Sequence, residues 1–160
     1  MANGMEQRTS SLRSAHASCK DTLRSVSGWS AELNRAAHAC KSKTQRFVTL
    51  SATEAECVAA VQCVQDMMCG KNFLESLGLK VKLPMVLYMD NKGGGDIFNS
   101  WSIAGNARAA SIRFACIREL KEQGILIIKW INGEENAADM YTKNLDGVTH
   151  EKHTDYYCDG

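Results

Sequence analysis

The stretch Leu50–Ala59, LSATEAECVA, contains the clearest start of a helix in the chain. Ser51 is followed three residues later by Glu54, which is the spacing of a capping box: the serine oxygen accepts a hydrogen bond from the third helical amide, and the glutamate reaches back to the serine amide. Apolar residues then recur at helical spacing as far as Leu77, where Gly78 follows. We therefore predict a long helix over residues 55–77, in which Glu54 has a sufficient structural role.

Glu56, in the same turn, is not explained by capping. At about 100° per residue it points some 200° away from Glu54 and lines up with Ala60 and Met67 on the flank of the apolar stripe. A single glutamate in a first turn is most often a surface group that compensates the helix dipole. From this stretch alone, a surface role and a chemical role both stay open for Glu56.

The chain on either side of this helix predicts a mixed α/β domain. Periodicity and β-propensity indicate strands, and Ala36–Lys43 carries a weaker strand pattern. Asn91–Gly95, NKGGG, is expected to be a loop. Strands are predicted at 25–34, 46–50, 84–90 and 125–130, and further helices at 104–123 and 134–145. This alternation is typical of helices packed on a sheet.

Size and composition fit one ordinary globular domain. The chain has 160 residues, of which 44% are hydrophobic and 23% charged, and a formal net charge of +1, so bulk charge predicts no particular partner. No apolar run approaches the roughly 20 residues that cross a bilayer, so we expect no membrane partner and a cytoplasmic or nuclear location. The seven cysteines form no CxxC pair and are expected to be free thiols. We predict a loose arm over 1–11, the domain over 12–145 and a polar tail over 146–160.

Two further carboxylates stand where functional groups are common. Asp90 ends an apolar strand, where open α/β sheets place their ligands, and Asp139 falls early in the last predicted helix. Each also has an ordinary explanation, as a turn residue or a helix-end charge. If both converge with Glu56, their repulsion requires a cation, and oxygen ligands favour Mg²⁺ or Mn²⁺ over zinc. Two such ions are a common device for the attack of water on a phosphodiester.

Four blocks of the sequence occur in this order: KDTLRSVSGW, KSKTQRFVTLSATEAECVAAVQ, VLYMDNKGG and NGEENAADMYTKNL, from about Asp21 to Leu145. Together they resemble the ribonuclease H domain of copia-type retrotransposon polyproteins. The resemblance implies a ribonuclease H-like mixed five-stranded sheet flanked by helices. It also implies hydrolysis of the RNA strand of an RNA–DNA hybrid by two Mg²⁺ ions, or Mn²⁺ in their place, held by Glu56, Asp90 and Asp139. The reverse transcriptase portion of the same polyprotein is the implied partner.

Other residues are candidates for contact with the nucleic-acid backbone. Asn91 follows Asp90, and Lys43, Arg108 and Lys143 are basic residues within or near the matching blocks. Substrate choice would depend on A-form shape and 2′-hydroxyl groups, which needs no base-specific contact. Asn91 is equally well explained as a turn residue, and exposed basic residues are common.

The first-strand block departs from the resemblance. Arg13 and Ala15 stand where the family has two aspartates, and no acidic residue lies between Glu6 and Asp21. In the family, the first-strand aspartate bridges both metal ions, so its loss removes a ligand from each. Ala109 and Ala115 also replace family histidines. The alternative hypothesis is therefore a catalytically inactive ribonuclease H-like module that at most binds nucleic acid or protein, and whether its first strand is degraded stays open.

Overall fold

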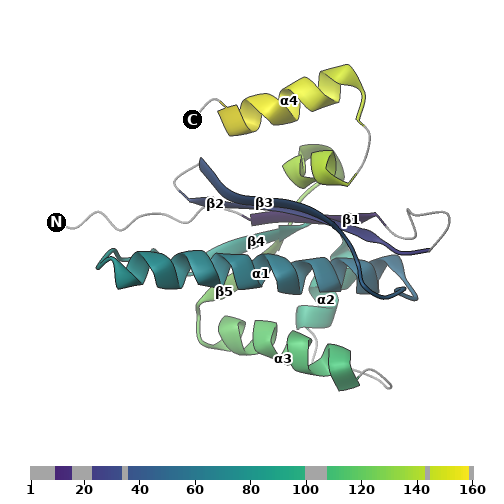
Figure 1. Cartoon of the computed structure of the whole chain (residues 1–160). Coiled ribbons are helices and arrows are strands. Elements are labelled where there is room, and N and C mark those ends of the chain that lie inside the picture. The colour runs from purple at the N-terminus through teal and green to yellow at the C-terminus, as the bar shows by residue number, and fades with distance from the viewer. Residues whose placement is uncertain (1–9, 16–22, 34–35, 100–107, 143–144, 159–160) are drawn as a thin grey trace.

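The computed structural model describes residues 10–15, 23–33, 36–99, 108–142 and 145–158 (Figure 1). The strands are β1 (Ser10–Ala15), β2 (Val26–Leu33), β3 (Ala36–Thr44), β4 (Met85–Met89) and β5 (Leu126–Trp130). The helices are α1 (Ala52–Ser76), α2 (Lys92–Asn99), α3 (Arg108–Glu122) and α4 (Gly147–Cys158), with short 3₁₀ turns η1 (Gly133–Glu135) and η2 (Ala137–Tyr141). The predicted mixed α/β character is confirmed, and the predicted residues 104–107 lie outside the described part.

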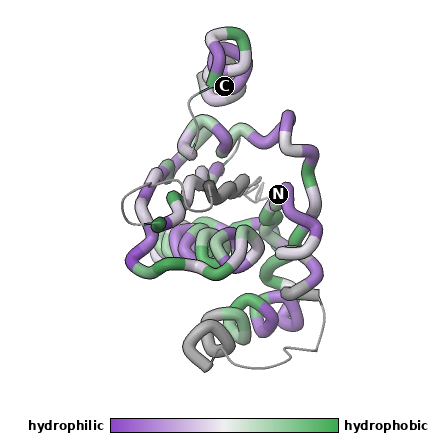
Figure 2. The backbone as a smooth tube through the Cα atoms, turned by 90° about the vertical axis from the view of Figure 1, so that its right-hand side faces the viewer, coloured by the Kyte–Doolittle hydropathy of each residue, from purple (hydrophilic) through white to green (hydrophobic). Residues whose placement is uncertain are grey.

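The strands pair in the order β3-β2-β1-β4-β5. β2 runs antiparallel to both β1 and β3, whereas β4 runs parallel to both β1 and β5. Helices α1 and α3 lie on one side of the sheet, and η2 and α4 lie on the other (Figure 1). Viewed from the side, α4 and α3 form the outermost layers, with α1 seen nearly along its axis between them (Figure 2). The parallel strands β1, β4 and β5 therefore end at one common edge.

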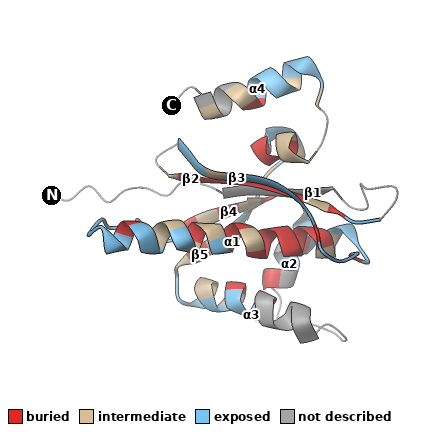
Figure 3. Cartoon of the chain, in the orientation of Figure 1, coloured by how far each residue is buried: buried red, intermediate tan, exposed pale blue. Residues whose placement is uncertain are grey.

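The core lies between α1 and the sheet, where α1 carries most of its buried residues (Figure 3). The α1 residues at helical spacing, including Cys57, Val64 and Met67, pack there. Trp29 on β2 is 2% exposed, and its indole Nε1 donates a hydrogen bond of 2.8 Å to Asp66 Oδ2. None of the described helices is long and apolar enough to cross a bilayer.

The second predicted strand was placed wrongly. Strand β3 occupies Ala36–Thr44, with the weaker pattern, and not 46–50. It pairs with β2 from Val26 to Leu33, so cross-strand pairing outweighs its polar, exposed composition. The strand ends where Gln45 turns inward: its side-chain Nε2 donates to Ser27 Oγ and to the Ala55 carbonyl at 2.7 and 2.8 Å.

The predicted loop Asn91–Gly95 is also wrong, because α2 begins within it. The Gly94 amide donates to Asn91 Oδ1 at 3.3 Å, which closes the first turn. A Cβ atom on Gly94 would lie 2.8 Å from Met89 Cε. The absence of a side chain therefore serves close packing of α2 on the end of β4.

The two ends of the chain are more ordered than the sequence predicts. The first strand forms, and β1 begins at Ser10, inside the predicted arm, because it pairs with β2 on one side and β4 on the other. The predicted closing helix at 134–145 is wrong, because the chain forms the two short 3₁₀ turns η1 and η2 in this region. Helix α4 occupies most of the predicted tail: Tyr157 Oη donates to Ser30 Oγ at 2.8 Å, and His153 is buried.

Candidate functional site

The start of α1 is capped much as the sequence predicts. The Glu54 amide donates to Ser51 Oγ at 3.1 Å. Glu54 Oε2 accepts from the amide of Leu50 at 2.8 Å, one residue before the serine amide that the capping box would use. The structural role predicted for Glu54 is confirmed, with a one-residue shift of its partner.

Glu56 points inward. It is only 7% exposed, so its alternative as a solvated surface group is wrong. Its Oε2 lies 3.7 Å from where a Cβ atom of Gly94 would stand, near the start of α2. Since Gly94 is four residues beyond Asp90, the Glu56 carboxylate is directed toward the segment that follows β4.

Asp90 and Asn91 are tied to their neighbours on both sides. Asn91 Nδ2 donates to Thr53 Oγ1 of α1 at 3.4 Å, and Trp130 Nε1 of β5 donates to the Asp90 carbonyl at 3.0 Å. The elements that carry Glu56 and Asp90 therefore lie side by side at the common strand edge. The Asn91 side chain bonds to Thr53 and to Gly94 inside the fold, and its predicted contact with nucleic acid stays a prediction.

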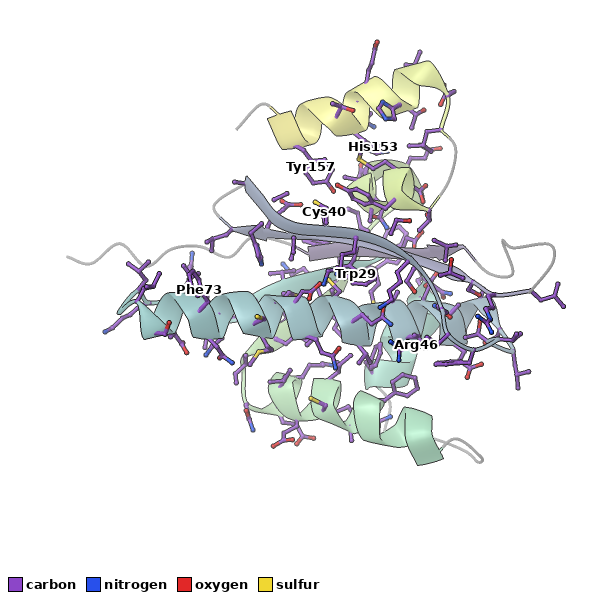
Figure 4. All side chains as sticks on the ribbon, in the orientation of Figure 1. Trp29, Cys40, Arg46, Phe73, His153 and Tyr157 are labelled. Atoms are coloured by element: carbon purple, nitrogen blue, oxygen red, sulfur yellow. The ribbon has the colours of Figure 1, made fainter. Side chains whose placement is uncertain are left out.

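Asp139 lies on η2, which packs on β1 and β2 from the face opposite α1 (Figure 1). It is 8% exposed and lines a cavity of about 510 Å³ together with Lys152 and His153 of α4. Figure 4 shows His153 between α4 and the 3₁₀ turns. Burial lowers the pKa of His153, Lys152 lowers that pKa further, and the Asp139 carboxylate acts in the opposite direction.

The β1 position beside Asp90 holds no carboxylate. Parallel pairing runs from Ser10 opposite Leu87 to Leu12 opposite Met89, where β4 ends, and Arg13 and Asp90 are the residues that follow this last pair. On its other side Arg13 is paired with Gly28 of β2. The whole strand, SSLRSA, contains no acidic residue.

These residues do not fit a two-ion centre. Among the residues that the structure describes, no group of three or more His, Cys, Asp and Glu side chains is arranged to hold a metal ion. A bridging oxygen ligand would have to come from β1, and an arginine offers none. The roles predicted for Glu56, Asp90 and Asp139 stay predictions.

The predicted basic contacts are scattered. Lys43 is exposed at the end of β3 and lines a different cavity. Arg108 is the first residue of α3, and its side chain and Lys143 lie outside the described part. Sequence reasoning missed Arg46 and Phe47, which line the cavity with Lys43; a basic residue followed by an exposed aromatic was the available signal.

Cys57, next to Glu56, is expected to resist alkylation while the chain is folded. Burial, reinforced by the Glu56 and Glu54 carboxylates, raises the pKa of Cys57 to about 12. At pH 8 its thiolate fraction is then roughly 1,000-fold below that of an ordinary thiol. In native chain treated with iodoacetamide, mass spectrometry of peptides should find the exposed Cys40, Cys69 and Cys116 modified and Cys57 intact. Equal modification of all four would contradict this burial.

Comparison with known proteins finds relatives for most of the chain. No family model matches it. It is 33% identical over 123 residues to the retrovirus-related Pol polyprotein from transposon TNT 1-94 of Nicotiana tabacum, covering 77% of this chain and 9% of that protein. The polyprotein from transposon RE1 of Arabidopsis thaliana is 27% identical over 126 residues, covering 79% of this chain and 9% of that protein. The chain thus spans about a tenth of the length of the relatives it matches.

Solved structures with the same fold are ribonucleases H. The LC11-RNase H1 complex with an RNA/DNA hybrid has a TM-score of 0.59 at 15% identity, covering 83% of this chain and 91% of that one. RNase H1 from Halobacterium salinarum has a TM-score of 0.54 at 15% identity, covering 96% and 99%. At such identities the likeness shows a ribonuclease H-like fold.

Proposed function

This chain is a ribonuclease H-like domain homologous to a short segment of retrovirus-related Pol polyproteins from copia-type transposons, and from this premise we propose that it binds RNA–DNA hybrid without hydrolysing it. We further propose that a mixed five-stranded sheet is the scaffold that carries the binding surface for the hybrid. The proposal also extends to the reverse transcriptase portion of a polyprotein as a partner, because the relatives are many times longer than the matched segment.

The observation that carries the proposal is the identity of the residue beside Asp90. Two-ion hydrolysis needs carboxylate oxygens that bridge the ions. Glu56 and Asp90 are retained on adjoining elements. On β1, which pairs antiparallel with β2 and parallel with β4, the corresponding position is occupied by Arg13 and not by a carboxylate. An arginine has no oxygen atom that could serve as a ligand, so this β1 position cannot hold a divalent cation as a carboxylate would.

Hybrid binding is supported by fold and by chemistry. The structure of LC11-RNase H1 is described in complex with RNA/DNA hybrid, and this chain has the same fold. An arginine attracts a phosphate backbone, whereas a carboxylate repels it. An arginine in β1 in place of a carboxylate therefore removes a metal ligand but does not disfavour the binding of nucleic acid. Mg²⁺ is then not a resident cofactor of this chain.

The second candidate function is a metal-dependent endonuclease on the same hybrid. The observation that favours it is the retention of the buried Glu56 beside the segment that follows Asp90. It would require the ions to be held without a ligand from β1.

Incubation with an end-labelled RNA–DNA hybrid in Mg²⁺ or Mn²⁺ separates the two candidates. We expect the hybrid to shift in a native gel and its RNA strand to stay intact, and the Asp90→Asn variant to behave as the native chain. Hydrolysis that disappears in Asp90→Asn would overturn the proposal in favour of the endonuclease. No shift of hybrid at any chain concentration tested would overturn the binding half of it.

A further inference from the structure

A second cavity, of about 270 Å³, lies between the end of β3, the connection that follows it and α1. Val58 and Val61 of α1 form its apolar wall, and Lys43, Arg46, Phe47 and Gln62 supply its functional groups. Figure 4 marks Arg46 beside the part of α1 near its start. Nothing in the proposed function uses this cavity.

The cavity is separate from the candidate acids. β3 is at one edge of the sheet and β4 is three strands away, which corresponds to about 14 Å. Along α1, Val58, Val61 and Gln62 point between about 140° and 240° from the direction of Glu56. The two sites therefore lie on opposite flanks of the same helix.

The cavity is positively charged without compensation. Lys43 and Arg46 are exposed, and the side chain of neither forms an ion pair or hydrogen bond with a residue that the structure describes. No acidic residue belongs to the lining. The nearby Lys41, by contrast, is paired with Asp66 at 2.9 Å. Two unpaired cations over one cavity favour an anion there.

Two further groups of the cavity, Gln62 and Phe47, favour a ligand that has other functional groups besides an anionic one. Gln62 belongs to the lining, and its side-chain Oε1 has no hydrogen-bond partner among the described residues, so the Gln62 amide is a group that a polar ligand could satisfy. Phe47 is 42% exposed and offers an aromatic ring for stacking. Gln45 holds the connection in place through its bonds to Ser27 and Ala55, so these groups are pre-positioned.

We propose that this cavity binds one nucleotide of a single-stranded nucleic acid. A nucleotide carries all the complementary groups in one unit: a phosphate for Lys43 and Arg46, a base to stack on Phe47, and an N–H or sugar hydroxyl for Gln62. A base inside a duplex cannot offer its face, so the preferred ligand is unpaired. This site is distinct from the hybrid-binding surface and does not depend on it.

The charge contribution is tested by fluorescence anisotropy with a labelled 15-nucleotide single-stranded DNA. The double variant Lys43→Gln/Arg46→Gln should lower affinity and reduce the slope of log K against log salt by about 0.7, the value for one lost phosphate contact on a single strand. The matched control Lys80→Gln/Lys82→Gln changes the same charge on the connection between α1 and β4 and should leave affinity within about twofold at the same salt. Equal losses in both variants would overturn the proposal, because they would show bulk charge alone.

The stacking contribution is tested with Phe47→Ala. Loss of one stacked base should weaken binding by about 5- to 150-fold. Phe73→Ala, at an aromatic that is 63% exposed near the far end of α1, is the control and should have no effect. Unchanged affinity in Phe47→Ala, or tighter binding of poly-glutamate than of the oligonucleotide, would overturn the proposal; the latter would indicate an acidic protein ligand. Binding of the RNA–DNA hybrid can persist in every one of these outcomes. A negative result for the single-strand site therefore does not overturn the proposed function, and the reverse also holds.

Discussion

The Arg13→Asp variant is expected to gain hydrolysis of the RNA strand of an RNA–DNA hybrid that the native chain leaves intact. The substitution places a carboxylate at the β1 position beside Asp90, across from the segment that Glu56 faces. A bound divalent ion contributes several kcal/mol to stabilising charge in phosphodiester hydrolysis, so we expect the rate in Mg²⁺ to rise at least about 100-fold above background.

Two further variants separate the ligand from the removed charge. Arg13→Asn removes the cation without supplying a carboxylate and should stay inactive. Arg13→Asp combined with Asp90→Asn should lose the gained activity, because it again lacks one ligand. If Arg13→Asp folds, binds hybrid and still shows no hydrolysis in Mg²⁺ or Mn²⁺, the missing β1 carboxylate is not what prevents turnover.

Gly28→Ala is expected to lower the free energy of unfolding by about 1–3 kcal/mol. Gly28 lies on β2, and a Cβ atom there would stand 2.6 Å from Thr142 Cγ2 and 2.7 Å from Tyr141 Cβ. Real carbon atoms do not approach so closely, so η2 must move away from the sheet. Urea unfolding followed by circular dichroism measures the loss.

Gly147→Ala is the matched control, because a Cβ atom at Gly147 would meet nothing within 4 Å. At this first residue of α4, alanine should change stability by no more than about 1 kcal/mol and in the stabilising direction. Equal destabilisation by the two substitutions would show that the contact between β2 and η2 is not tight.

The elements that were predicted well are those with a strong pattern of their own. Helix α1 has a capping box and an apolar stripe, and β4 and β5 are dense apolar runs. The elements that were missed depend on distant partners. β3 is extended because β2 pairs along it, and α2 forms across three glycines because it packs on Met89.

Only part of the candidate site could be predicted, because the rest depends on contacts between segments that are distant in the sequence. Helix geometry separates the direction of Glu56 from that of Glu54, but its burial became clear only from the fold. The neighbour of Asp90 depends on the register between β1 and β4, which only the fold supplies. The Lys43 cavity combines an edge strand, a connection and the flank of a helix, so no local pattern could identify it.

The number of Mn²⁺ ions that the chain binds distinguishes a binding module from a two-ion nuclease. Electron paramagnetic resonance can count the ions on the chain in complex with hybrid, after subtraction of those on hybrid alone. We expect fewer than two ions on the native chain and two on Arg13→Asp. Two ions on the native chain, one of them lost in Asp90→Asn, would contradict this expectation.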